Sequence, residues 1–172
     1  MLYYSGLNTS GGKLLMDAEK QKIYFECLEK ELVNRNLKPV HVEGAGSPQV
    51  GDTLRFLIPM SEKGGAVMME LLLLDLGEKE FLLEFYTTMF TDVSDVQTDL
   101  SVEIPAWNFL CPLGSFGIFE EEGHLYHKYG LPFAEDTEPE AFVRQAVTVM
   151  KFLFDILADK YVAVLEMMIA EG

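Results

Sequence analysis

Two consecutive and almost wholly apolar segments constrain the fold of this chain more than any other feature. Residues 66–75 and 81–90 are typical of the two strands of a β-hairpin. A strand with one face in water should alternate apolar and polar residues, and here the polar half of that alternation is nearly missing. The sheet therefore needs cover on both faces. Because the chain has few helices, we expect a second subunit to supply part of that cover.

The register of this hairpin can be predicted from the way its apolar residues segregate. A two-residue turn at 77–78 would mix acidic and apolar side chains on both faces. A loop over 76–80 instead pairs Leu73 with Leu83 and gathers apolar residues on the face that should meet the helices. The second face is mostly apolar but carries two acids, and we predict that it is a protein interface made of Met68, Glu70, Leu72, Leu74, Leu82, Glu84 and Tyr86.

The remaining segments predict an α+β fold in a single domain over residues 1–172, with 1–12 as a flexible lead-in. An antiparallel sheet of about 5–6 strands should have an N-terminal and a C-terminal helix packed on one face, with a short helix between strands. The expected elements are a helix over 13–36, strands at 40–42 and 53–58, a short helix starting near Glu103, a hairpin of 116–119 with 124–129, and a helix over 141–169 capped by Thr137.

The charge balance excludes two classes of partner. The chain has 13 Lys and Arg against 28 Asp and Glu, for a formal net charge of −15. Nucleic acids and anionic membranes attract clustered cations, so neither is an expected partner. No segment has the roughly 20 apolar residues that span a bilayer, and the N-terminus does not read as a signal peptide.

The reactive residue types form no motif for catalysis or for a metal or cofactor. Cys27 and Cys111 lack metal-ligand spacing and are expected to be reduced thiols, which favours a cytoplasmic protein. His124 and His127 lie three residues apart on one predicted strand, so they face opposite sides and cannot share a metal. We therefore predict no catalytic residue, no cofactor and no metal site.

An alternative rests on the one carboxylate pair with a geometric basis. In the predicted register Glu70 and Glu84 are diagonal neighbours on one sheet face, where mutual repulsion could raise one pKa for acid–base work. The alternative is a small enzyme or ligand-binding domain with a pocket under the short helix that uses Glu70, Glu84 or His127.

The second half of the chain resembles a known family. Trp107–Asn108, the stretch 114–118, the acidic turn 122–126 and the capped terminal helix ending at Gly172 resemble the bacterial YbjN-like family. That family has the fold of the type III secretion chaperones. The likeness is clearest over residues 100–172.

The chain departs from the family in having Pro105 inside the short helix and an extra strand near the start. The resemblance implies a non-catalytic, dimer-forming protein that binds other proteins and has a sensory or regulatory role. From the sequence we thus expect a homodimeric, chaperone-like or regulatory module that binds a protein client.

Overall fold

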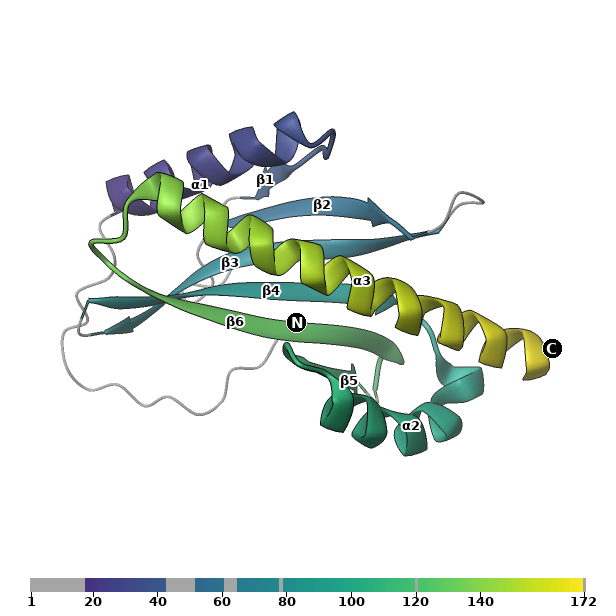
Figure 1. The fold of residues 1–172 in the computed structure, drawn as a ribbon. Coiled ribbons are helices and arrows are strands. Elements are labelled where there is room, and N and C mark those ends of the chain that lie inside the picture. Colours follow the sequence, from purple (N-terminus) through teal and green to yellow (C-terminus); the bar gives the residue numbers. More distant parts are fainter. Residues whose placement is uncertain (1–17, 43–51, 61–64, 78, 120, 172) are drawn as a thin grey trace.

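Helices cover one side of an antiparallel sheet in the computed structural model (Figure 1). The structure describes residues 18–42, 52–60, 65–77, 79–119 and 121–171. The predicted lead-in over 1–12, the first residues of the predicted N-terminal helix and Gly172 lie outside these ranges. The described part confirms an α+β fold.

The sheet has six strands in the order β1-β2-β3-β4-β6-β5, and every neighbouring pair is antiparallel. One pair of neighbours, β4 and β6, is not consecutive along the chain, because β5 lies beyond β6 at the edge. The strands are β1 (Val40–Val42), β2 (Thr53–Pro59), β3 (Ala66–Gly77), β4 (Glu80–Phe90), β5 (Ser115–Phe119) and β6 (His124–Ala134).

The register predicted for the central hairpin is confirmed. Leu73 pairs with Leu83, and the same alignment continues along both strands. The predicted loop over 76–80 is too long, since Gly77 and Glu80 still pair across a register shift that follows Asp75. This bulge adds one residue to β3 and so preserves the segregation of the two faces. The Asp75 side chain stabilises it by accepting a hydrogen bond from the Gly77 amide over 2.7 Å.

The helices are α1 (Ala18–Asn34), α2 (Gln97–Leu110) and α3 (Pro139–Glu171), with a short 3-10 turn, η1 (Ser94–Val96), before α2. The predicted start of the short helix near Glu103 is wrong by about two turns. No side chain caps the start of α2. Its first turns are instead held by burial of Val96 and Leu100, and Pro105 is accommodated on the exposed side of the helix.

The start of α3 also differs from the expected capping box. The Glu138 carbonyl accepts the first helical hydrogen bond, from Phe142 over 2.9 Å, so Thr137 lies one residue too early to be the cap. Within the described part of the chain, the Thr137 hydroxyl makes no hydrogen bond. The Thr137 carbonyl instead accepts a 2.6 Å hydrogen bond from the Tyr24 hydroxyl of α1, which joins the two helices at this end.

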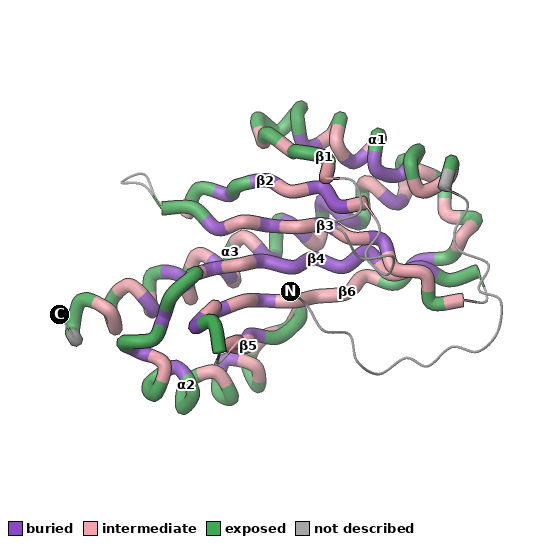
Figure 2. Tube along the Cα trace, turned by 180° about the vertical axis from the view of Figure 1, so that it is seen from behind, coloured by how far each residue is buried: buried purple, intermediate pink, exposed green. Residues whose placement is uncertain are grey.

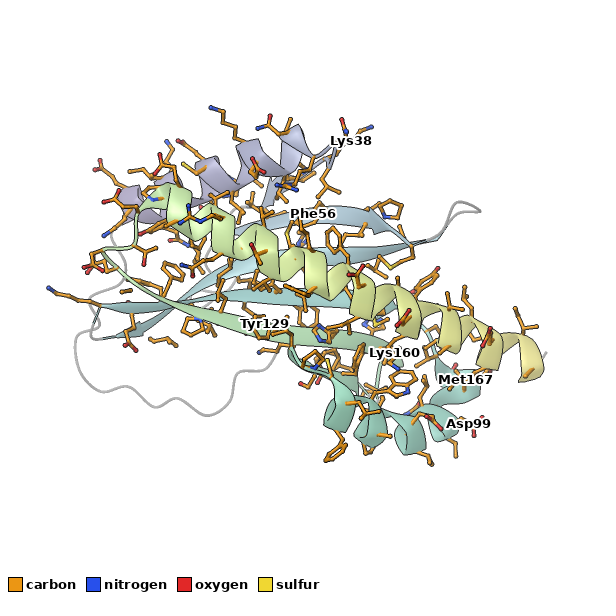
Figure 3. The ribbon with its side chains drawn as sticks, in the orientation of Figure 1. Lys38, Phe56, Asp99, Tyr129, Lys160 and Met167 are labelled. Atoms are coloured by element: carbon orange, nitrogen blue, oxygen red, sulfur yellow. The ribbon has the colours of Figure 1, made fainter. Side chains whose placement is uncertain are left out.

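The core lies between the helices and one face of the sheet. Phe25, Leu28 and Leu32 of α1 are buried there, as the helical spacing predicts. At the far end, the C-terminal part of α3 lies beside η1 and close to α2 (Figure 1). Lys160 extends from α3 toward α2, where its Nζ lies 5.1 Å from the centre of the Trp107 ring (Figure 3). Trp107 in turn packs edge-on against Phe116 of β5.

Candidate functional site

The candidate site is the second face of the sheet, which we call the open face. Within the described ranges no helix or strand packs on it, and Figure 2 shows the sheet from this side with α3 behind it. Strand pairing brings β2, β4 and β6 residues to this face beside those of β3. Leu57 of β2, opposite Met68, is 63% exposed.

The structure gathers all seven predicted interface residues on this face, but they are not equally accessible. Met68, Glu70, Leu72, Leu74 and Leu82 are partly exposed, whereas Glu84 and Tyr86 are buried. Any contact surface here is therefore formed by the three leucines and Met68. Leu57 adjoins them and was not among the interface residues predicted from the sequence. Glu84 and Tyr86 lie beneath that surface.

Both acids on the open face have a cationic partner. Arg55 of β2 is directly opposite Glu70 and forms an ion pair with it. Lys128 of β6 places its Nζ 2.8 Å from a Glu84 carboxylate oxygen, although only 4% of the Glu84 side chain is exposed. Glu70 and Glu84 are diagonal neighbours, as the sequence predicts. The result is a polar band across the sheet with no unbalanced charge among these four side chains.

An aromatic stack lies beside this band. The Tyr126 ring stacks on Tyr86 at 5.5 Å and on Phe119 at 4.7 Å. It also covers Gly117, where an added Cβ would lie 2.5 Å from the Tyr126 hydroxyl. Burial is the main reason that the pKa of Tyr86 is raised above its ordinary value, and the adjoining Tyr126 and Glu70 add to it. Tyr86 therefore stays neutral even at a pH where an ordinary tyrosine begins to ionise.

A second apolar surface, on the outer side of α2, was missed by the sequence argument. Val102, Phe109 and Leu110 are 73%, 88% and 76% exposed. The signal was present in the sequence, because this helix has apolar residues on the side opposite its buried stripe as well as on the stripe itself.

His127 lies on the opposite face of the sheet from Glu70 and Glu84, fully buried under the end of α2. Its Nε2 is 2.9 Å from the Leu113 carbonyl oxygen and 4.0 Å from the Cys111 sulfur. Because a carbonyl only accepts, Nε2 carries the proton and donates it. Nδ1 makes no hydrogen bond within the described part of the chain, and neither does the hydroxyl of Thr87, its partner across β4 and β6.

Burial lowers the pKa of His127, and the hydrogen bond to Leu113 opposes this shift only in part. A folded-state pKa below the unfolded value of about 6.5 means that neutral His127 stabilises the fold above that pH. We expect this contribution to be lost as the pH falls below the unfolded value of about 6.5 and through the lowered folded-state pKa. Urea midpoints measured across this range should fall for the native chain and fall less for His127→Gln. Parallel curves for the two proteins would contradict the assignment.

These positions do not support the pocket of the alternative hypothesis. Glu70 and Glu84 share the open face with their cations, while His127 is enclosed on the other side of the sheet. Neither the hollow along the exposed side of α1 nor the cavity between α1 and α3 is lined by any of the three. No group of three or more His, Cys, Asp or Glu side chains in those residues has the arrangement of a metal site. None of the described helices is long and apolar enough to cross a membrane.

No family model matches the chain, and no curated protein matches it. The likeness to the YbjN-like family therefore stays a prediction based on the residues that carry it.

Proposed function

We propose that this chain is a non-catalytic protein-binding module, chaperone-like or regulatory, whose open face meets a second copy of itself or a protein client. The observation that carries the proposal is the open face: a mainly apolar sheet surface on which no described helix or strand packs. An apolar face of this kind favours contact with another protein over contact with water.

The charge pairing on the open face supports the same proposal. A partner that covers this face removes Glu70 and Glu84 further from water, which is costly for an isolated charge. Here each acid already has a cation from a neighbouring strand, Arg55 or Lys128. The desolvation cost of covering the two acids is therefore already reduced in the free protein. Burial of the leucines around them can then give a net favourable free energy of association.

A homodimer is the simplest form of this proposal, because a two-fold interface presents the same surface from both copies. A stable dimer buries about 800 Å² on each partner. The net charge of −15 opposes the approach of two copies at low ionic strength, so association should be measured in physiological salt. The two free cysteines fit the reducing cytoplasm that we propose as the compartment.

Leu72→Lys tests the proposal, since Leu72 lies at the centre of the open face and is only partly buried. The added ammonium group would have to be desolvated in any interface formed there. We expect the variant to be monomeric by sedimentation at a concentration on the order of tens of micromolar at which the native chain is dimeric. Its circular dichroism spectrum should be unchanged.

Val162→Lys is the matched control, because it adds the same charge at an exposed position of α3 on the other side of the molecule. It should leave the mass unchanged. The proposal would be contradicted if the native chain were strictly monomeric and captured no protein through the open face. It would also be contradicted if both variants dissociated the dimer to the same extent.

A further inference from the structure

A cavity of about 520 Å³ lies between α1 and α3, away from the open face. One stripe of each helix lines it, at spacings of three and four residues that keep its members on the same side of the helix. The stripe of α1 consists of Cys27, Lys30, Glu31, Asn34 and Arg35, and that of α3 of Glu140, Val143, Arg144, Val147, Thr148 and Lys151.

The charge of this groove is opposite to that of the chain. Four of its side chains are cationic (Lys30, Arg35, Arg144 and Lys151) and two are anionic (Glu31 and Glu140), so its local balance is +2. The whole chain carries −15 and has only 13 Lys and Arg. Nearly a third of the cationic residues thus line one cavity, and their positive balance favours an anion there despite the acidic surface of the chain.

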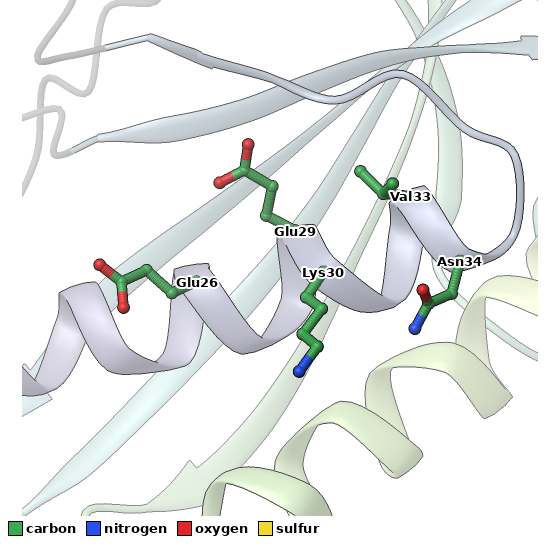
Figure 4. Close-up of a pocket in the computed structure, with 5 residues that line it drawn as sticks. All are labelled: Glu26, Glu29, Lys30, Val33 and Asn34. Carbon is green, nitrogen blue, oxygen red and sulfur yellow. The ribbon is translucent and has the colours of Figure 1, made fainter.

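Three of the four cations are available to a ligand. Glu31 holds Arg35, whose Nε and Nη2 lie 2.8 Å and 2.7 Å from the same carboxylate oxygen. Lys30, Arg144 and Lys151 are exposed, and none of them forms an ion pair within the described part of the chain. Figure 4 shows Lys30 and Asn34 pointing from α1 toward α3, whereas Glu29 points away from it. The cations therefore converge from both walls.

The groove is also elongated, and part of its lining is apolar. Arg144 and Lys151 are seven residues apart on α3, which separates them by about 10 Å along the helix axis. Val143 and Val147 lie on the same stripe as these cations, and Val147 is buried. A cavity of this size fits a small molecule. Charged groups at both ends and the buried Val147 between them suit a ligand with two anionic groups joined by a less polar segment.

We propose that the groove between α1 and α3 binds a small organic oxyanion with at least two anionic groups, a phosphate ester or a polycarboxylate. Arg144 holds one group and Lys151 the other, Lys30 reaches them from the opposite wall, and Val147 contacts the segment between them. Large polyanions are excluded, because a surface of −15 around so small a groove repels them. This site lies outside the proposed protein interface and stands independently of it.

Inorganic tripolyphosphate and citrate are suitable probes, titrated into the full chain and followed by backbone amide chemical shifts. Saturable shifts confined to residues 27–35 and 140–151 are expected for at least one probe. Preference for tripolyphosphate would identify phosphate esters as the natural class, and preference for citrate would identify carboxylates. The proposal would be overturned if neither probe shifted the resonances of these residues. It would also be overturned if the shifts were spread over the surface and did not saturate.

A pair of charge-matched variants separates the groove from the charge of the chain. The groove variant carries Lys30→Gln, Arg144→Gln and Lys151→Gln. The control carries Lys22→Gln, Lys38→Gln and Lys79→Gln, which remove the same charge from exposed positions outside the groove. We expect the groove variant to bind about tenfold more weakly or worse, through lost charge-assisted hydrogen bonds, and the control to change less than about twofold. Equal weakening in both variants would overturn the site.

Discussion

Gly114→Ala is expected to lower the free energy of unfolding by about 3 kcal/mol or more, a large share of the total for a domain of this size. Two effects add. Gly114 has φ of +78°, a conformation that strains any residue with a Cβ. That Cβ would also lie 2.3 Å from the Lys128 carbonyl oxygen and 2.7 Å from the His127 ring. Neither neighbour can yield easily, because one is backbone in β6 and the other is fully buried.

Gly77→Ala separates these two effects. Gly77 has a similar φ of +82°, but no atom lies within 4 Å of the position that a Cβ would take. Its replacement should therefore cost only the backbone strain, about 1–2 kcal/mol. Urea denaturation of both variants measures the difference, with equal m-values as the check on two-state behaviour. Equal losses would mean that the close approach of Gly114 to β6 does not matter for stability.

Tyr24→Ala should be about as damaging, with a loss of about 3–5 kcal/mol, the range for truncating a large buried aromatic side chain. Tyr24 is buried between α1 and the start of α3, where its ring lies 4.7 Å from Phe142 and 5.5 Å from Phe133. Its hydroxyl donates to the Thr137 carbonyl over 2.6 Å. Truncation therefore removes one ring from an aromatic cluster, together with the hydrogen bond from α1 to the segment that leads into α3.

Two milder variants divide this loss. Tyr24→Phe keeps the ring and removes only the hydroxyl, so about 1 kcal/mol should be lost, with the carbonyl left short of a donor. Ile23→Ala changes the adjacent residue, which is half exposed, and should cost well under the loss for Tyr24→Ala. Thermal or urea unfolding of the three proteins gives the comparison. A Tyr24→Phe variant as unstable as Tyr24→Ala would place the whole effect in the hydrogen bond.

The register of the central hairpin was predictable because β3 and β4 are consecutive in the chain and segregate their apolar residues sharply. In the central hairpin a shift of one residue exchanges the two faces, so Leu73 opposite Leu83 was the one alignment that kept the acids off the core side. The bulge that follows Asp75 was not predictable in this way, since it preserves the segregation while shortening the loop.

The features that escaped prediction depend on residues far apart in the chain. Tyr24 meets Thr137 across more than a hundred positions, and nothing near Tyr24 in the sequence marks it as special. The cations of the groove are equally scattered: Lys30 belongs to one helix, and Arg144 and Lys151 to another. Each looks like an ordinary solvated residue until the packing of α1 beside α3 places them together.

The two outermost strands are also the shortest, with three residues in β1 and five in β5. A long, flat and apolar edge strand exposes unpaired backbone N–H and C=O groups, which can pair with a strand of another molecule and start aggregation. Here the long strands β3 and β4 are at the centre, hydrogen-bonded to a neighbour on either side. The short edge strands thus leave few unpaired backbone groups to which another strand could be added. We expect copies of the chain to associate through the faces of their sheets, not through the edges.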